Sequence, residues 1–140
     1  MRLWDLGTGQ CVRVMEGHAD WVNTVSMDSA CKTAVSGSGD NAVRLWDLGS
    51  GQCIETYEHG QIVHDVMMHE SGRSFLSVGK STVKAWATAS GPDRPILDTD
   101  LSALCDPDEA LHGAASRDLS RVGVCFLNPD GDKIGLSVWR

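Results

Sequence analysis

Short runs of apolar and β-branched residues alternate along the chain with clusters of Gly, Asp, Ser and Asn. In the best-patterned stretch the runs fall at 22–27, 33–38, 42–47 and 52–58, and turn-forming residues lie at 28–32, 39–41 and 48–51. Runs bounded in this way are typical of β-strands. No segment keeps the three-to-four-residue apolar spacing of an amphipathic helix over several turns. The pattern therefore predicts an all-β chain of short antiparallel strands.

One segment of this pattern occurs twice. Residues 2–11 and 44–53 are identical at nine of ten positions, and the remaining position exchanges Thr8 for Ser50. The copies are 42 residues apart. Four short strands at about this period make one blade of a β-propeller. A residue that recurs at this interval is therefore first interpreted as part of the repeated unit, and only second as a candidate for chemistry.

Two dipeptides identify the type of repeat more closely. Gly17-His18 is followed by Trp46-Asp47, with Ser36 and Asp40 between them. This arrangement resembles the G-H…W-D signature of the WD40 repeat family. The resemblance implies four-stranded antiparallel blades and, by match of position, a hydrogen-bonded structural tetrad of a His, a Ser, an Asp and a Trp. Its members here would be His18, Ser36, Asp40 and Trp46.

The next unit, residues 59–97, is a degenerate copy of this blade. The order becomes His59-Gly60, Lys80 stands where the acid of the tetrad is expected, and Trp86 is followed by Ala rather than Asp. We therefore expect this blade to be held mostly by apolar packing, with a looser turn at 79–81.

Residues 98–140 are harder to place in register. We expect a linking strand near Pro95–Leu97, an acidic loop over 98–111, and an incomplete last blade over 112–140. The spacing from His112 to Trp139 equals that from His59 to Trp86, which favours Trp139 on the third strand of this blade. An alternative register puts Trp139 on the second strand.

The units add up to about three blades, since residues 1–16 read as the end of a first blade and 17–58 as the best-matching one. Propellers usually have four to eight blades, so these units are not enough to close a ring alone. We expect a partial WD40-type propeller, either a fragment of a longer propeller protein or a chain that closes its ring with further blades or by self-association.

Charge and cysteine content narrow the partners and the compartment. The chain has 19 acidic and 12 basic residues, a formal net charge of −7, which disfavours nucleic acid and anionic membrane surfaces as partners. The N-terminus shows no secretory signal. The five cysteines include no C-x-x-C pair, so we interpret them as reduced thiols. We expect an intracellular protein, cytoplasmic rather than nuclear.

No catalytic, cofactor or metal-binding pattern is visible. Three of the five histidines, His18, His59 and His112, recur at the blade starts, and no nucleophile or phosphate-loop signature is present. The expected function is a non-catalytic scaffold for other proteins. Its partner-binding face would include Trp21, Asn23 and His64, near the loops that enter the first strands. The alternative is a regulatory or sensor region of a multidomain signalling ATPase or ubiquitin-ligase-type enzyme.

Overall fold

The structure is a computed structural model that describes residues 1–89, 95–100, 111–115, 121–127 and 133–139, with side chains up to Asp100. All regular elements in these ranges are strands. They are β1 (Arg2–Asp5), β2 (Gln10–Val14), β3 (Val22–Met27), β4 (Thr33–Ser38), β5 (Ala42–Asp47), β6 (Cys53–Glu58), β7 (Asp65–Met68), β8 (Ser74–Val78), β9 (Thr82–Ala87), β10 (Leu97–Asp100), β11 (Leu111–Ala115), β12 (Arg121–Leu127) and β13 (Lys133–Trp139).

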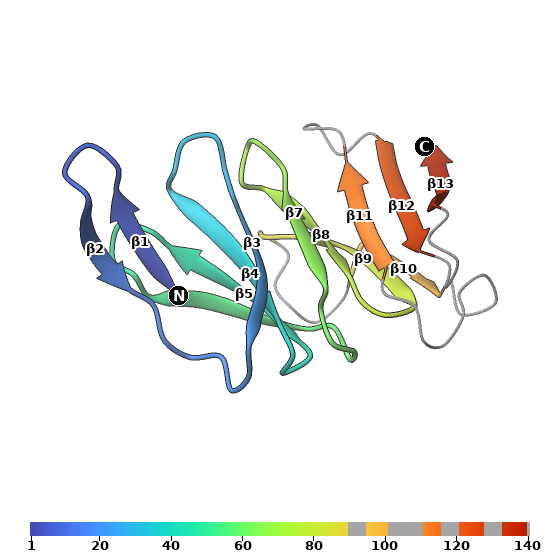
Figure 1. The fold of residues 1–140 in the computed structure, drawn as a ribbon, viewed down its shortest axis with the longest axis horizontal. Coiled ribbons are helices and arrows are strands. Elements are labelled where there is room, and N and C mark those ends of the chain that lie inside the picture. The colour runs from blue at the N-terminus through green and yellow to red at the C-terminus, as the bar shows by residue number, and fades with distance from the viewer. Residues whose placement is uncertain (90–94, 101–110, 116–120, 128–132, 140) are drawn as a thin grey trace.

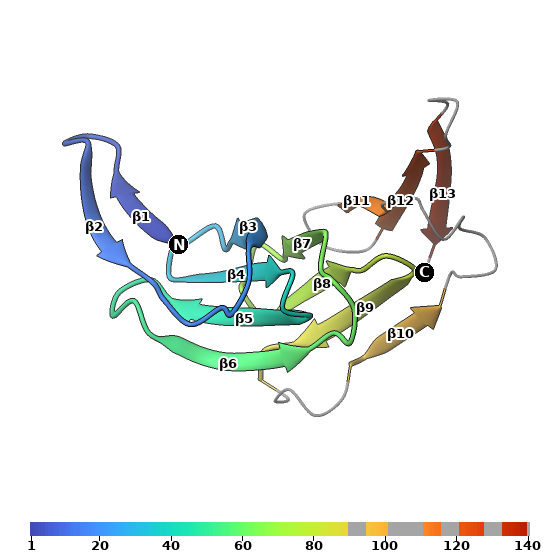
Figure 2. The same ribbon diagram turned by 60° about the horizontal axis from the view of Figure 1, so that its bottom comes forward.

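The strands form four antiparallel sheets in chain order. Two of them have four strands, β3-β4-β5-β6 and β7-β8-β9-β10, and are called the first and second blades below. A two-stranded sheet, β1-β2, precedes them and a three-stranded sheet, β11-β12-β13, follows. The sheets stand side by side, and β3, β7 and β11 lie next to one another as the innermost strands (Figures 1 and 2). This arrangement confirms the predicted all-β, partial propeller fold.

The duplicated segment builds the same turn twice. In the first copy the Thr8 N–H donates to Asp5 Oδ1 over 2.8 Å, and in the second the Ser50 N–H donates to Asp47 Oδ1 over 2.6 Å. The glycine after each hydroxyl residue has a positive φ, 69° at Gly9 and 77° at Gly51, a conformation that glycine adopts without strain. The repeated residues thus form the same tight turn between the third and fourth strands of a blade.

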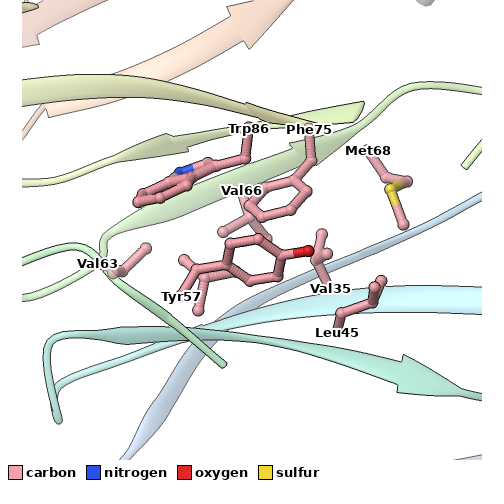
Figure 3. Close-up of a cluster of buried hydrophobic side chains, with 9 residues drawn as sticks. Val35, Leu45, Tyr57, Val63, Val66, Met68, Phe75 and Trp86 are labelled. Atoms are coloured by element: carbon pink, nitrogen blue, oxygen red, sulfur yellow. The ribbon is translucent and has the colours of Figure 1, made fainter. Parts of the chain in front are cut away.

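The largest hydrophobic core lies between the two blades. Tyr57 of the first blade meets Phe75 and Trp86 of the second edge-on, with ring centroids 4.9 Å and 5.3 Å apart. Aliphatic side chains from both blades surround these rings (Figure 3): Val35, Val43, Leu45, Val63, Val66 and Met68. Because neither sheet can bury this surface alone, the two blades depend on each other for stability.

A second, smaller core joins the β1-β2 hairpin to the outer half of the first blade. Its buried members are Met15, Ala34, Trp46 and Leu48, with Met1, Leu3 and Cys53 packed against them. The Arg13 side chain reaches across from β2 and donates from Nη2 to the Gly49 carbonyl over 2.9 Å. The hairpin is therefore fixed to the first blade by packing and by hydrogen bonds.

The strands predicted at 22–27, 33–38 and 42–47 have the observed bounds, whereas the prediction for the end of the second blade was wrong. The strand expected at Pro95–Leu97 is β10, Leu97–Asp100, which extends into the range expected to be an acidic loop. β10 pairs with β9, and Asp98 forms an ion pair with Lys84 at 3.3 Å. Backbone pairing and this ion pair hold an acidic segment in a sheet. Residues 101–110 of the expected loop lie outside the described residues.

The third sheet contains the strands that the favoured register assigns to it. β11 contains His112, and Trp139 is on β13, the third strand of the sheet. The alternative, with Trp139 on a second strand, is therefore wrong.

Candidate functional site

Four side chains of the first blade form one continuous hydrogen-bonded chain. The Trp46 indole N–H donates to Ser36 Oγ over 2.8 Å, and Ser36 Oγ lies 2.7 Å from Nε2 of His18. On the other side of the imidazole, Nδ1 of His18 lies 2.8 Å from Oδ2 of Asp40. The order Trp46, Ser36, His18, Asp40 lets each group donate to the next and ends on a carboxylate. The structure thus brings together all four residues of the expected tetrad.

Asp40 also fixes the backbone around it. Its Oδ2 accepts from the Ala19 N–H over 3.0 Å, and its Oδ1 accepts from the Ala42 N–H over 3.1 Å. Partial burial opposes ionisation of Asp40, but the hydrogen bonds from Ala19, His18 and Ala42 outweigh it and lower the pKa of the carboxyl. One ionised carboxylate therefore connects the loop that enters β3 with the turn between β4 and β5.

The second blade contains a corresponding chain without the acid. The Trp86 indole N–H donates to Ser77 Oγ over 2.8 Å, and Ser77 Oγ lies 2.8 Å from Nδ1 of His59. The other ring nitrogen, Nε2, lies 2.8 Å from Thr82 Oγ1, which donates to Gln61 Oε1 over 3.3 Å. His59 therefore faces its serine with Nδ1, whereas His18 faces its serine with Nε2. The chain of hydrogen bonds in the second blade ends on a neutral carboxamide.

Gln61 also fastens the turn that follows β8. Its Oε1 accepts from the Ser81 N–H, and its Nε2 donates to Ser81 Oγ, each over 3.0 Å. The looser turn expected at 79–81 is therefore held by hydrogen bonds instead, while the apolar packing expected of this blade is present in the core around Phe75 and Trp86. Gln61 lies 20 residues before Ser81 and matches no residue of the G-H…W-D signature. The signal in the sequence was the reversed order His59-Gly60, which is followed directly by the polar residue Gln61.

Burial sets the protonation state of His59. The side chain is fully buried, and this desolvation, with a smaller contribution from the charge of Lys84, lowers the pKa of His59 to about 4. The residue is therefore neutral near pH 7. This state matches its surroundings, because one ring nitrogen accepts from Ser77 and the other donates to Thr82.

Side chains of β3 reach the free edge of β7 and join the two blades. Ser26 Oγ accepts from the Met68 N–H over 2.9 Å, and Thr24 Oγ1 accepts from the Val66 N–H over 3.4 Å. Asn23, a candidate for the partner-binding face, donates from Nδ2 to the Val63 carbonyl over 3.0 Å. Its amide therefore links the two blades.

The other two candidates for the partner-binding face lie at the starts of the inner strands. Trp21 is 83% exposed, although its backbone is fixed by the Gly39 N–H, which donates to the Trp21 carbonyl over 2.9 Å. His64 is half-buried, and its N–H donates to the Val78 carbonyl over 2.8 Å. The sequence reasoning missed Ile62, which is exposed and follows Trp21 by 41 residues, the offset that relates β3 and β4 of the first blade to β7 and β8 of the second. Two large apolar side chains thus stand at equivalent positions of consecutive blades.

The described residues contain no group of three or more His, Cys, Asp or Glu side chains placed to hold a metal ion. None of the described segments forms a helix with the length and apolarity needed to cross a bilayer. Cys11, Cys31 and Cys53 are free thiols, and the side chains of the other two cysteines lie outside the described residues.

Comparison with known proteins supports the interpretation of the repeat. Residues 9–47 match the family model of the WD domain, G-beta repeat. This span runs from β2 to β5 and contains the whole hydrogen-bonded chain from Trp46 to Asp40.

Curated relatives match over larger and smaller parts of the chain. U3 small nucleolar RNA-associated protein 15 of Schizosaccharomyces pombe is 33% identical over 95 residues, 68% of this chain and 19% of the relative. Nuclear distribution protein nudF of Aspergillus niger is 40% identical over 42 residues, 30% of this chain and 10% of the relative. A probable E3 ubiquitin ligase complex SCF subunit, sconB of Arthroderma benhamiae, is 53% identical over 32 residues, 23% of this chain and 5% of the relative.

The chain thus spans less than a fifth of the length of each of these relatives. The four-stranded blades, the duplicated turn and the family match agree with one another, and WD40 repeats indicate a protein-interaction scaffold. The chain belongs to the WD40 repeat family.

Proposed function

We propose that the chain is a non-catalytic interaction scaffold whose partner-binding face is centred on Trp21 and includes Ile62. The observation that carries this proposal is the exposure of Trp21, 83%, on a backbone whose carbonyl accepts a hydrogen bond from the Gly39 N–H. Large aromatic side chains of this kind are enriched among the residues that contribute most of an interface's binding energy. His64, half-buried beside Ile62, lies at the border of this face.

The polar chemistry of the blades supports a structural rather than a catalytic role. The Ser, His and Asp side chains of the first blade resemble a hydrolytic triad in composition. However, Ser36 Oγ accepts the Trp46 indole N–H and is fully buried. A catalytic serine must reach its substrate. This serine instead satisfies buried polar groups, and no cofactor is needed for the proposed role.

Trp21→Ala tests the proposal. Partners captured by quantitative cross-linking in cells of the source organism should fall at least about tenfold, because a central aromatic anchor contributes much of an interface's binding energy. Leu6→Ala is the matched control, because Leu6 is a fully exposed apolar side chain in the turn between β1 and β2. Equal losses in the two variants, or no loss in either, would contradict the proposal.

A second candidate function is a regulatory region of a ubiquitin-ligase-type or ATPase-containing protein. The similarity of 32 residues, at 53% identity, to a probable E3 ubiquitin ligase complex SCF subunit favours it. Ubiquitin-ligase subunits among the partners lost in Trp21→Ala would support this candidate. The full transcript also separates the two, since further G-H…W-D repeats alone favour the plain scaffold and a phosphate-loop sequence favours the ATPase.

We also propose that the chain works inside the cell, in the cytoplasm rather than the nucleus, within a larger set of blades. The free thiols of Cys11, Cys31 and Cys53 support a reducing compartment. A fluorescent fusion should give a diffuse cytoplasmic signal. A nucleolar signal would contradict this and would suit the relative whose name refers to a small nucleolar RNA.

A further inference from the structure

The loops that carry Trp21 and Ile62 are hydrogen-bonded to consecutive residues of the first blade. The Gly39 N–H donates to the Trp21 carbonyl over 2.9 Å, and the Val63 N–H, next to Ile62, donates to the Ser38 carbonyl over 3.0 Å. The loops that enter β3 and β7 therefore lie side by side, at the lower edge of the view in Figure 1. Trp21 is 83% exposed and Ile62 is 46% exposed. The two apolar side chains thus belong to one surface that spans both blades.

A carboxylate is held beside Trp21. The Oδ1 atom of Asp20 accepts the Trp21 N–H over 2.7 Å. Its Oδ2 atom lies against Gly39, where an added Cβ would come within 3.0 Å of it. Asp20 is nevertheless exposed, and the ion pairs among the described side chains, His18–Asp40 and Lys84–Asp98, do not include it. A fixed carboxylate without a cation therefore lies next to an exposed indole.

The two ends of the first blade differ in charge. Because its strands are antiparallel, the start of β3, the end of β4, the start of β5 and the end of β6 all lie at the end that carries Trp21. The segments of this end, residues 16–22, 38–42 and 57–62, contain no Lys or Arg. Their acidic residues are Glu16, Asp20, Asp40 and Glu58. The opposite end has charges of both signs, since Lys32 lies in the turn after β3 and Asp47 ends β5.

Two cations limit the extent of this acidic surface. Arg44 on β5 is partly buried, and its guanidinium lies against Gly17. Lys80 is exposed in the turn that follows β8, at the same end of the second blade. The negative charge is therefore concentrated on the first blade, where Trp21 lies, and not on the second, where Ile62 lies.

We propose that this surface binds a lysine- or arginine-bearing peptide segment of a partner protein. The cationic side chain lies on the Trp21 indole, whose ring attracts cations, and pairs with the carboxylate of Asp20. An aliphatic side chain of the same segment packs on Ile62. An acidic or phosphorylated segment is repelled by Asp20 and Glu58. The inference rests on the proposed function and adds to it the chemistry of the partner.

Fluorescence polarisation of short labelled peptides measures this preference with the full chain. A peptide of alternating lysine and leucine should bind at least about tenfold more tightly than one of alternating glutamate and leucine. Added salt should weaken the binding of the lysine peptide, because it screens exposed charges. Trp21→Leu keeps an apolar side chain but removes the ring, and it should weaken the binding of the lysine peptide about threefold.

A pair of matched variants separates the local carboxylate from the net charge of the chain. Asp20→Asn keeps an oxygen that can accept the Trp21 N–H and removes only the charge, so it should weaken the binding of the lysine peptide about threefold. Glu70→Gln removes the same charge from an exposed residue in the turn between β7 and β8, at the opposite end. It should leave the binding unchanged.

NMR titration with the lysine peptide locates the binding. The Trp21 indole and Ile62 methyl signals should shift, whereas the methyl signals of Leu6, in the turn between β1 and β2, should not. No binding of the lysine peptide, equal or tighter binding of the glutamate peptide, or equal losses in Asp20→Asn and Glu70→Gln would overturn the inference. If Trp21→Ala still loses cross-linked partners, the proposed function stands without it, and if Trp21→Ala loses none, the proposed function itself fails.

Discussion

The two complete blades solve the same structural problem with different chemistry. Each one buries a tryptophan whose indole N–H is taken by a serine, and each serine leads to a histidine. In the first blade the chain of hydrogen bonds ends on the carboxylate of Asp40, and in the second it passes through Thr82 to the carboxamide of Gln61. The part that stays constant is the part that satisfies the buried indole and imidazole.

This difference shows which feature of the repeat is required by physics and which is exchangeable. A buried donor without a partner costs on the order of 1–3 kcal/mol, so the Trp–Ser–His portion has little freedom. The last acceptor only has to be an oxygen in the right place. An amide supplies it at Gln61, and the neutral chain suits a histidine whose burial lowers its pKa to about 4.

The largest expected effect is the loss of an aromatic ring from the core between the blades. Trp86→Ala should destabilise the protein by about 3–5 kcal/mol, because the ring is fully buried against Tyr57 and Phe75. Trp4→Ala is the matched control and should change stability by less than about 0.5 kcal/mol, since Trp4 is half exposed. Urea denaturation measures both, and similar losses would mean that the second blade is not packed as described.

Acid should weaken the second blade before the first. The pKa of His59 is 6.5 in the unfolded chain and about 4 in the folded one, so the folded state resists protonation. The contribution of neutral His59 to the free energy of unfolding is fully present above pH 6.5. About 3 kcal/mol of it is lost as the pH drops to about 4. The lowered pKa of Asp40 gives a loss only below its ordinary value of 3.8. Thermal melts between pH 7.5 and 4 should show the first loss, and His59→Gln should largely abolish it.

Removing the last acceptor of each chain compares the two solutions directly. Asp40→Ala should cost about 1–3 kcal/mol, because it leaves the Ala19 N–H, the Ala42 N–H and the His18 ring without an acceptor. Gln61→Ala should cost about 1 kcal/mol, because its neutral bonds are weaker and water reaches its half-buried position. Both are measured best in a version extended by further blades. A larger loss of stability in Gln61→Ala than in Asp40→Ala would contradict the expected order of the two acceptors.

The smallest expected effect concerns a hydroxyl with no partner among the described residues. Tyr57 is fully buried between the blades, and its hydroxyl makes no hydrogen bond there. Tyr57→Phe should therefore be neutral or stabilising by up to about 1 kcal/mol. A clear destabilisation in calorimetry would show that the hydroxyl has a partner in solution.

The sequence predicted the first blade well because local and repeat signals agree there. Gly and Asp residues end each strand, and the duplicated Arg2–Cys11 segment fixes where the third strand turns into the fourth. The fold class followed from this blade alone. The positions of His18 and Asp40 followed from the G-H…W-D resemblance, and the structure brings both into one hydrogen-bonded chain.

The second blade was predicted less well because its stabilising contacts join residues that no local pattern connects. Gln61 acts on Ser81, and Lys84 pairs with Asp98 across neighbouring strands. Strand β10 has acidic residues where strands usually have β-branched ones, so composition favoured a loop. Pairing with β9 overrides that local preference. The inter-blade role of Asn23 was also hidden, since its partner is a backbone carbonyl of the next unit.

The tautomers of the two buried histidines test the central comparison most directly. Nitrogen-15 NMR of the imidazole rings at pH 6 should show His59 neutral with its proton on Nε2, since Nδ1 accepts from Ser77. His18 should instead carry a proton on Nδ1, which faces Asp40. A charged His59 at this pH, or a proton on Nδ1 of His59, would contradict the account that the second blade replaces a carboxylate with a neutral acceptor.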